Sequence, residues 1–361
     1  MSNHLVMKIF NSSAPIRICD LGGWTDTWFA RHGRIFNIGV YPYVEVQLAV
    51  YPASEREQRV VIHAENYGER YTLPEGGRSA SGGWVRHPLL EAAIEYMHVP
   101  DHLAFEATIY SDAPTGMSTG TSAAVSVALI GALDCLRPGR MTPHEIALAA
   151  HRVETELLGQ QSGIQDQLCS AYGGINYLEM FAYPHASLSQ IQIPNALWWE
   201  LERRLALIYL GNSHSSSQVH EMVIRGLEDA GPDCPQLEDL RQTAPRARDA
   251  LYAGDFAALG QAMMDNTDAQ RRLHPALVSR EADRVIEIAR EHGAAGWKVN
   301  GAGGEGGSLT LLCGAHSEIK RAMLREIEQD NPLFKNIPIY LSRYGLRVWE
   351  QSIAEDKTKK T

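Results

Sequence analysis

The stretch Asp112-Ala-Pro-Thr-Gly116-Met-Ser-Thr-Gly120-Thr-Ser-Ala-Ala124 stands between two apolar segments and decides how the chain is organised. Residues 104–110 before it are rich in strand formers, and the alanine-, valine- and leucine-rich residues 123–133 after it indicate a buried helix. The order strand, glycine turn, helix places the first free N–H groups of the helix, at the positive end of its dipole, beside a backbone that glycine leaves uncovered. This arrangement predicts an anion site, most simply one for phosphate.

Two other motifs compete for the same residues. The P-loop motif is Gly-x4-Gly-Lys-Ser/Thr. Counted from Gly116, its second glycine position holds Thr121 and no lysine follows, so this motif is excluded. The letters of the nucleophile elbow, Gly-x-Ser-x-Gly, match residues 116–120 and would make Ser118 the nucleophile of a serine hydrolase. Residues 112–115 intervene after the strand, and no His-Gly-Gly-Gly segment lies upstream, so the hydrolase and an ordinary glycine turn are kept as alternatives.

The composition is that of a globular chain with an acidic balance. Its 361 residues are enough for two domains with separate cores, and 44% of them are hydrophobic and 21% charged. The formal net charge of −10 argues against nucleic acid or an anionic membrane as a partner, so a bound phosphate must be met locally. The five cysteines form no Cys-x-x-Cys pair and fit a reducing compartment such as the cytoplasm. We expect no targeting segment and no membrane span.

The first half of the chain is predicted to be strand-rich before the helix at 123–133. Alternating apolar residues predict strands at 5–10, 35–40 and 44–50, with Tyr41-Pro-Tyr43 as the turn between the last two. Thr142 and Glu145 form a capping-box pattern at the start of a helix that should run to about Gly159. A short helix should follow from about residue 162 to 173, and a strand from residue 175.

The second half changes in texture from about residue 200. We expect a strand at 206–210 and then helices across 216–230, 236–252, 254–266 and 276–292. Strand, glycine loop, strand and helix should follow through 296–328, with a last strand near 337–341 and a charged tail at 354–361. The glycine loop contains a literal Gly-x-Gly-x-x-Gly, but a strand pattern follows it where a dinucleotide fold needs a helix. We therefore expect this loop to press its backbone against a substrate or a neighbouring loop.

Four motifs, in order along the chain, resemble the signature segments of the GHMP kinases, the family of galactokinase, homoserine kinase, mevalonate kinase and phosphomevalonate kinase. The resemblance covers most of the chain, from residue 14 to residue 307. The motifs are Ala14-Pro-x-Arg17-x5-Gly23-x-Thr-Asp26, Pro114-x-Gly-x3-Gly120-x-Ser122-Ala-Ala, Glu154-x4-Gly159-x3-Gly163-Ile-x-Asp166-Gln and Gly301-Ala-Gly-Gly-x-Gly-Gly307. The Gly-Gly-Trp-Thr-Asp form and the loop that begins at Lys298 are most similar to those of sugar 1-kinases acting on L-fucose and on D-glycero-D-manno-heptose 7-phosphate.

The resemblance implies an α+β fold of two domains with an active-site cleft between them. An N-terminal mixed α/β domain, residues 1–200, would hold ATP and magnesium, and a ferredoxin-like C-terminal domain, residues 201–361, would close the cleft. The activity implied is that of an ATP- and Mg²⁺-dependent kinase that makes a sugar 1-phosphate. Asp166 would be the catalytic carboxylate beside the sugar hydroxyl, with Arg17 as its charge partner. The chemistry agrees, because an ionised Asp can accept a hydroxyl proton and magnesium neutralises charge on the transferring phosphoryl group.

The other roles also follow from the resemblance. Ser122 and Glu154 would bind magnesium, while Asp26, Trp24 and Gly163 would meet the sugar. The residues that would shape the triphosphate loop are Pro114, Gly116, Ser118, Thr119, Gly120, Thr121 and Ser122. The C-terminal glycine loop would contribute Gly301, Gly303, Gly304 and Gly306.

Departures from the family pattern bear on the substrate. Galactokinase carries Glu-His where this chain has Gly23-Trp24, so D-galactose is not expected, and Trp24 is either a platform for a sugar face or a core residue. The phosphate loop has Met-Ser-Thr-Gly-Thr where the family commonly shows x-Gly-Leu-Gly-Ser. His214 stands where heptose-phosphate kinases carry arginine, or is simply a surface histidine. A free sugar such as L-fucose is therefore an alternative to the heptose phosphate, and a non-catalytic sugar and ATP sensor is another. A homodimer is left open.

Overall fold

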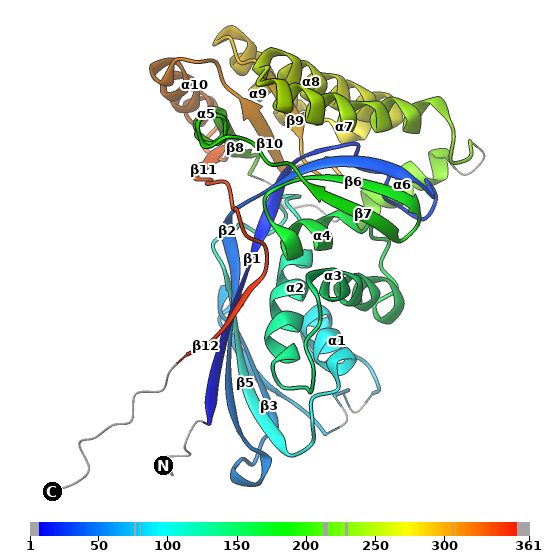
Figure 1. Cartoon of the computed structure of the whole chain (residues 1–361), viewed down its shortest axis with the longest axis vertical. Helices are drawn as coiled ribbons and strands as arrows, with labels where there is room; N and C mark the ends of the chain where they lie inside the picture. Colours follow the sequence, from blue (N-terminus) through cyan, green and yellow to red (C-terminus); the bar gives the residue numbers. More distant parts are fainter. Residues whose placement is uncertain are drawn as a thin grey trace, which may run out of the picture.

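The structure is a computed structural model that describes residues 7–75, 77–79, 81–211, 216–227, 230–304 and 306–351. Two β-sheets organise it, one of eight strands and one of four. In Figure 1 the larger sheet and its helices fill the lower part of the molecule, and the smaller sheet and its helices fill the upper part. The last strand, β12 (red), runs back down beside β1 (blue).

The larger sheet has the strand order β12-β1-β2-β5-β3-β4, with β6 paired to β2 and β7 paired to β6. Strand β3 runs parallel to β5, and β1 pairs antiparallel with both β2 and β12. The strands are β1 Lys8–Leu21, β2 Gly33–Pro52, β3 Val60–Ala64, β4 Glu69–Leu73, β5 Leu103–Ser111, β6 Ile175–Ala182, β7 His185–Gln190 and β12 Arg347–Gln351.

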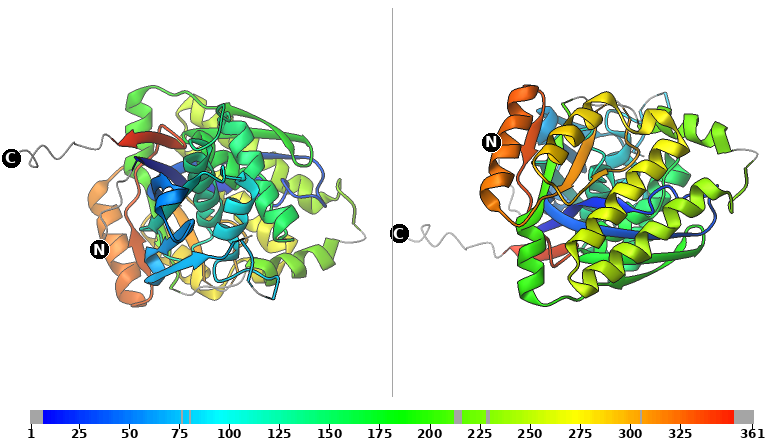
Figure 2. Two further views of the ribbon diagram at one scale, coloured as in Figure 1. Left: turned by 90° about the horizontal axis from the view of Figure 1, so that it is seen from below. Right: turned by 90° about the horizontal axis from the view of Figure 1, so that it is seen from above.

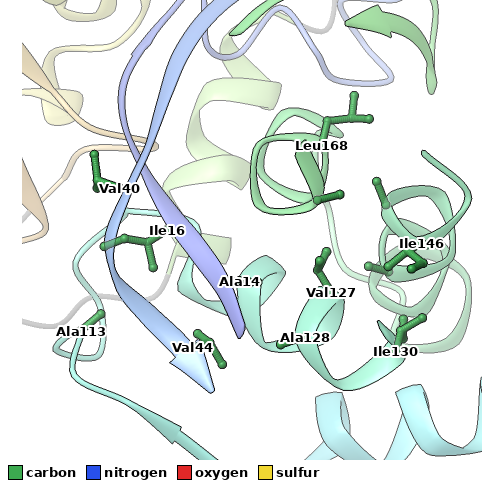
Figure 3. Packing of buried hydrophobic residues seen from close by; sticks show 14 of the residues in the cluster. Ala14, Ile16, Val40, Val44, Ala113, Val127, Ala128, Ile130, Ile146 and Leu168 are labelled. Carbon is green, nitrogen blue, oxygen red and sulfur yellow. The ribbon is translucent and has the colours of Figure 1, made fainter. Parts of the chain in front are cut away.

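Helices α2 and α4 pack on strands β1 and β2 of the larger sheet, and α1 and α3 pack on α2, which is the predicted central helix. It contacts β1, β2 and the three other helices, and it is buried nearly all round, as its run of alanine, valine and leucine predicts. Figure 3 shows Val127 and Ile130 of α2 between β-strand residues such as Ile16 and the helix residues Ile146 and Leu168. The helices are α1 Pro88–Met97, α2 Thr121–Asp134, α3 Pro143–Arg152 and α4 Gln165–Tyr172.

The smaller sheet confirms the ferredoxin-like expectation. Its strand order is β11-β8-β10-β9, which is 4-1-3-2 in chain order, and every neighbouring pair is antiparallel. Helices α9 and α10 lie in the two crossovers of this unit, as the ββ pair β9–β10 requires. The elements are β8 Leu205–Tyr209, α9 Arg280–Glu291, β9 Gly296–Val299, β10 Ser308–Leu312, α10 Ser317–Asp330 and β11 Lys335–Ile337.

The remaining helices lie between β8 and α9, apart from α5, which precedes β8. Helices α7 and α8 contact each other; α7 packs on β1 and β2, while α8 contacts both β1 of the larger sheet and β9 of the smaller one and so connects the two sheets. Figure 2 shows these yellow-green helices over the blue strands when the molecule is seen from above. The elements are α5 Asn195–Arg204, α6 Ser216–Leu227, α7 Pro235–Ala253 and α8 Phe256–Leu273, with short 3₁₀ turns η1 Ala53–Glu55, η2 Glu65–Tyr67 and η4 Pro275–Leu277.

The predicted turn at 41–43 is wrong, because β2 is one continuous strand. Ile16 of β1 pairs with Val40, and the residue before it, Pro15, pairs with Tyr43, so residues 41–42 are inserted in β2 without a reversal. Such a bulge bends a strand while both of its flanks stay paired with the same neighbour. The proline between two aromatic residues correctly indicated an irregular backbone here, but the irregularity is a bulge and not a turn.

Several other boundaries are confirmed or corrected. Thr142 caps α3 in the predicted capping box, since its Oγ1 accepts a bond from the Glu145 N–H at 3.2 Å. The helix then continues as a π-helical turn, η3 Val153–Leu157, which the sequence did not indicate. Strand β12 was not expected, and it brings residues 347–351 into the first sheet. The division at residue 200 stays a prediction. In the described ranges, no helix is long and apolar enough to cross a membrane.

Candidate active site

The phosphate loop connects β5 to α2 as predicted. Helix α2 begins at Thr121, and Gly120 at its N-cap has a φ of +69°, in the left-handed region that glycine adopts readily. Ala124 N–H makes the first bond of the helical ladder, to the Gly120 carbonyl, so the amides just before it have no acceptor within the helix. A cavity lies in front of them, lined by residues 116–123 together with Arg17, Glu154 and Asp166.

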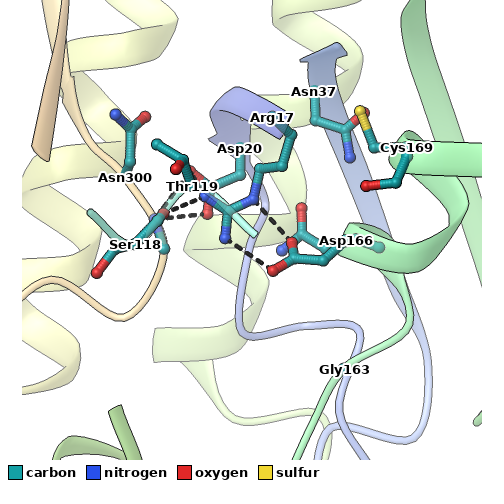
Figure 4. Close-up of polar contacts among 12 residues, drawn as sticks. Arg17, Asp20, Asn37, Ser118, Thr119, Gly163, Asp166, Cys169 and Asn300 are labelled. Atoms are coloured by element: carbon teal, nitrogen blue, oxygen red, sulfur yellow. Dashed lines mark hydrogen bonds and ion pairs between the residues drawn. The ribbon is translucent and has the colours of Figure 1, made fainter. Parts of the chain in front are cut away.

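Asp166 and Arg17 form the ion pair that the sequence suggested. Arg17 comes from β1 and Asp166 from the first turn of α4, and the Nε–Oδ1 and Nη2–Oδ2 distances are 2.7 and 3.2 Å. Arg17 Nη1 also donates to the Ser118 carbonyl oxygen. Figure 4 shows the guanidinium between the phosphate loop and Asp166. Burial lowers the pKa of Arg17, but attraction to Asp166 and Asp20 outweighs it and raises that pKa above its ordinary value.

Glu154 lies on the π-helical turn and lines the same cavity as Ser122. Its Oε2 accepts bonds from Ser162 Oγ at 2.7 Å and Gln167 Nε2 at 2.9 Å, while its buried Oε1 has no hydrogen-bond partner in the described structure. Burial raises the pKa of Glu154 to about 7. An unsatisfied carboxylate oxygen near a hydroxyl, beside a predicted phosphate site, fits a magnesium ion, which prefers hard oxygen ligands.

A second cavity adjoins the first and shares Arg17 and Asp166 with it. Asp26 lines this cavity and is fixed by the Gln165 N–H, which lies 3.0 Å from Asp26 Oδ2. Burial raises the pKa of Asp26 to about 6. Gly163 is held close, because a Cβ at this position would lie 2.0 Å from Asp26 Oδ2. Two of the three residues predicted to meet the sugar, Asp26 and Gly163, therefore lie together.

Trp24 lies both in an apolar cluster and at the wall of the second cavity, so its role as a platform for a sugar face stays a prediction. Its side chain is only 6% exposed and belongs to an apolar cluster with Val223, Leu237 and Leu277. The same residue lines the second cavity. Its φ of +76° is in the left-handed region, which is unusual for a bulky residue, and strain of this kind is often retained near functional sites.

The C-terminal glycine loop presses against the phosphate loop, as expected. A Cβ at Gly301 would lie 2.7 Å from the Ser118 carbonyl oxygen, and one at Gly303 would lie 2.0 Å from the Leu277 carbonyl oxygen. Gly304 forms an isolated bridge with Val278, and Gly306 also has a positive φ, of +91°. Ser308 Oγ, at the end of the loop, donates to the Met117 carbonyl at 2.6 Å. A side chain at Gly301 would therefore force the two loops apart.

Known proteins share both halves of this architecture. Residues 88–174 match the family described as GHMP kinases N terminal domain, and residues 247–328 match GHMP kinases C terminal. A mevalonate kinase of Pyrococcus abyssi is 30% identical over 274 residues, which are 74% of this chain and 74% of that protein. The chain belongs to the GHMP kinases.

Two further relatives of this GHMP kinase bear on its detail. A D-glycero-alpha-D-manno-heptose 7-phosphate kinase of Campylobacter jejuni is 28% identical over 307 residues, covering 83% of this chain and 88% of that protein. The crystal structure of a D-glycero-D-manno-heptose 1-phosphate kinase from Bacteroides thetaiotaomicron has a TM-score of 0.72 at 20% identity, over 95% of this chain and all of the other. Members of this family are phosphotransferases with an alcohol acceptor, so the chain is a kinase.

The sequence missed a third cavity of this GHMP kinase, beside the phosphate loop. It joins the first cavity at Gly116, Thr121 and Ser122, and its walls are mostly apolar, with Ile109 and Val125 among them. The side chains of Tyr67 and His87 also line it, and their ring centroids are 4.9 Å apart. These residues come from four separate segments, so no local pattern could have indicated the cavity.

Two buried charged residues were also missed as a pair. Asp20 lies inside the first motif and Lys298 just before the fourth, but neither was given a role. The structure brings Lys298 Nζ to 3.3 Å from Asp20 Oδ1. His214, the residue at the position where heptose-phosphate kinases carry arginine, lies outside the described residues.

Proposed function

We propose that this kinase transfers the γ-phosphoryl group of ATP to the anomeric hydroxyl of a monosaccharide or sugar phosphate. The observation that carries the proposal is the place of Asp166, which lines both the cavity of the phosphate loop and the cavity of Asp26. A base at the junction of a phosphate site and an acceptor site can take the hydroxyl proton as the phosphoryl group arrives. Arg17 holds this carboxylate by two hydrogen bonds, which fixes its orientation.

In this proposal the nucleotide occupies the cavity of the phosphate loop and the apolar cavity beside it. The triphosphate lies against the amide groups at the start of α2 and the hydroxyls of the loop, and the base lies in the apolar cavity of Tyr67 and His87. Ser122 and Glu154 would hold magnesium, which would neutralise charge on the phosphates. In the described structure, no group of three or more His, Cys, Asp or Glu side chains could hold a metal. A magnesium ion that also binds phosphate oxygens and water needs only one or two protein ligands, such as Ser122 and Glu154.

The first candidate substrate is D-glycero-D-manno-heptose 7-phosphate. The Campylobacter jejuni relative, identical at 28% of positions across most of both chains, carries this substrate in its name. The motif Gly22-Gly23-Trp24-Thr25-Asp26 and the loop from Lys298 support the same choice through their resemblance to such kinases. In this reading Asp26 holds ring hydroxyls while Asp166 faces carbon 1.

The second candidate is a free sugar such as L-fucose, and the charge of the acceptor cavity favours it. Three carboxylates line that cavity, those of Asp20, Asp26 and Asp166. Arg17 is the one Lys or Arg side chain among its described lining residues, and it is already bonded to Asp166. A distal phosphate would need another cation within reach.

Two other functions are weaker than the kinase. A serine hydrolase needs a base beside Ser118, but among the described residues that line the phosphate cavity none is a histidine, and Ser118 Oγ is buried without a partner. A sensor without turnover has no need to keep Asp166, Arg17, Glu154 and Ser122 around one cavity, as this chain does. The cytoplasmic location and the homodimer stay predictions.

An ATP-consumption screen over monosaccharides and sugar phosphates tests the proposal. The purified chain is incubated with Mg-ATP and each acceptor, and phosphorus-coupled NMR locates the new phosphate on the product. We expect it at the anomeric oxygen. Transfer to a primary hydroxyl, or to mevalonate or homoserine in preference to every sugar, would overturn the proposal. Preference for an unphosphorylated sugar would reject only the heptose phosphate.

A further inference from the structure

Lys298 is a fully buried lysine behind the candidate active site. It lies on β9 with an exposed fraction of 0%, and its Nζ is 3.3 Å from Oδ1 of Asp20, which is 1% exposed on β1. Its Nζ also donates to the Val299 carbonyl oxygen. A buried ammonium is costly unless an anion and further hydrogen bonds compensate its charge. Because apolar packing cannot offset this cost, the charged pair is expected to have a role in the adjoining active site.

Asp20 contacts two other groups in the same region. The Gly301 N–H lies 3.1 and 3.0 Å from its two carboxylate oxygens, and Arg17 Nη1 lies 3.8 Å from Oδ1. Burial raises the pKa of Asp20, but Arg17, Lys298 and the Gly301 amide outweigh it and lower that pKa below its usual value. Asp20 is thus a second carboxylate within reach of the arginine that holds Asp166.

The four charged side chains alternate in sign. Asp166 contacts Arg17 at 2.7 Å, Arg17 contacts Asp20 at 3.8 Å, and Asp20 contacts Lys298 at 3.3 Å. Figure 4 shows Arg17 between Asp166 on one side and Asp20 and Ser118 on the other. The charges of the two cations and the two carboxylates cancel. Because Lys298 compensates Asp20, Arg17 keeps its closer contact with Asp166. If Lys298 were neutral, Arg17 would be the one cation that contacts Asp20 among the described residues.

We propose that Lys298 is a positioning residue: it satisfies the charge of Asp20 and so leaves Arg17 to hold Asp166 in the orientation needed for phosphoryl transfer. The inference rests on the role of Asp166 proposed above. Lys298 lines neither the phosphate cavity nor the acceptor cavity, so it acts through Asp20 and Arg17 and touches no substrate. Its loss should therefore change kcat more than the KM for ATP.

The test compares three variants and a matched control in the full chain, with the acceptor that turns over fastest in the screen above. Lys298→Met keeps the length of the side chain without its charge, and we expect kcat to fall about 10- to 100-fold with the KM for ATP within about threefold. Asp20→Asn removes the competing carboxylate but leaves the Lys298 ammonium buried without its anion, so it should lower stability and serves only as the reference that the double-mutant cycle needs. The double variant Asp20→Asn/Lys298→Met removes both charges and should return kcat to within about fivefold of the wild type.

Lys320→Met is the control, because Lys320 is another largely buried lysine of the same half of the molecule. Its Nζ donates to the carbonyls of Arg203 and Leu205 and lies in neither active-site cavity. It should lower thermal stability but leave the kcat of the folded protein unchanged. A general effect of losing a buried ammonium would instead slow both Lys→Met variants alike, and that result would overturn the proposal.

A crystal structure of Lys298→Met reads the position of Arg17 without any sugar. We expect the guanidinium to move toward Asp20 and its contacts with Asp166 to lengthen, whereas an unmoved Arg17 contradicts the inference. If Lys298→Met does not fold, the double variant carries the test, and a folded double variant with a kcat lowered tenfold or more would refute it. An active Asp166→Asn variant would instead reject the proposed role of Asp166, so the two failures can be told apart.

Discussion

The two cavities that meet at Asp166 are lined by different kinds of chemical groups. The phosphate side comes mainly from one continuous stretch, residues 116–123, and offers backbone amides and hydroxyls. The acceptor side is built from buried charges, including Asp20 and Asp26, brought together from distant segments. Hydroxyls on a rigid loop can be exchanged at small cost, whereas buried charges depend on their partners. Substitutions should therefore cost most at the junction and on the acceptor side, and least in the loop.

The largest effect is expected at the junction itself. Asp166→Asn keeps the shape of the side chain and removes its negative charge, so kcat should fall roughly 10² to 10⁴-fold. The KM values should change little, because Arg17 can still be contacted by the amide oxygen. Steady-state kinetics over both substrates measures the split. Near wild-type turnover with unchanged magnesium dependence would show that another group takes the proton.

The next effect should appear on the acceptor side, at Gly163. In Gly163→Ala the new Cβ would lie 2.0 Å from Asp26 Oδ2, so the carboxylate must move away from the Gln165 N–H. We expect the KM for the acceptor to rise about tenfold or more, with a smaller change for ATP. Gly226→Ala is the control, since a Cβ there meets nothing within 4 Å. If both variants left the KM for the acceptor unchanged, Asp26 would have no part in binding the sugar.

The same contrast explains which parts the sequence predicted. The phosphate loop and the capping box at Thr142 are encoded locally, in glycine spacing and cap residues, whereas the ferredoxin-like unit was expected only from the family resemblance. The pairing of Asp20 with Lys298 joins residues far apart in the chain, and neither has a local signal. Strand β12 is short and mostly exposed, so its sequence shows no alternation, and only the free edge of β1 explains its pairing. Tertiary contacts, and not propensity, decided these features.

The proposed magnesium site combines a loop hydroxyl, that of Ser122, with a buried carboxylate, that of Glu154, so its expected effect is intermediate. Glu154→Gln keeps the hydrogen-bonding shape but offers magnesium a neutral oxygen, so the magnesium concentration for half-maximal rate should rise about tenfold. Ser162 and Gln167, which bond Glu154 Oε2, remain in place in this variant. A magnesium titration of the two proteins measures the shift. An unchanged titration would remove Glu154 from the metal site.

The pH dependence sharpens this prediction. Burial raises the pKa of Glu154 to about 7, so below pH 7 the metal-free carboxyl carries a proton that magnesium must displace. The half-saturating magnesium concentration should therefore rise by up to about tenfold for each pH unit below 7, and level off above it. Titrations at pH 6, 7 and 8 test the slope. Glu154→Gln cannot bind this proton and should lose most of the slope.

The smallest effect is expected in the loop, at Ser118. Its Oγ is buried without a hydrogen-bond partner among the described residues, so Ser118→Ala should cost at most one hydrogen bond, about 0.5–1.5 kcal/mol, and leave kcat/KM within about threefold. Ser118 has a φ of +58°, and alanine keeps that strain while glycine relieves it. Ser118→Gly should therefore be more stable than Ser118→Ala by about 1 kcal/mol in chemical denaturation, at similar activity. If ester cleavage without ATP turnover were found and vanished in Ser118→Ala, the hydroxyl would be a nucleophile and the contrast between loop and charges would fail.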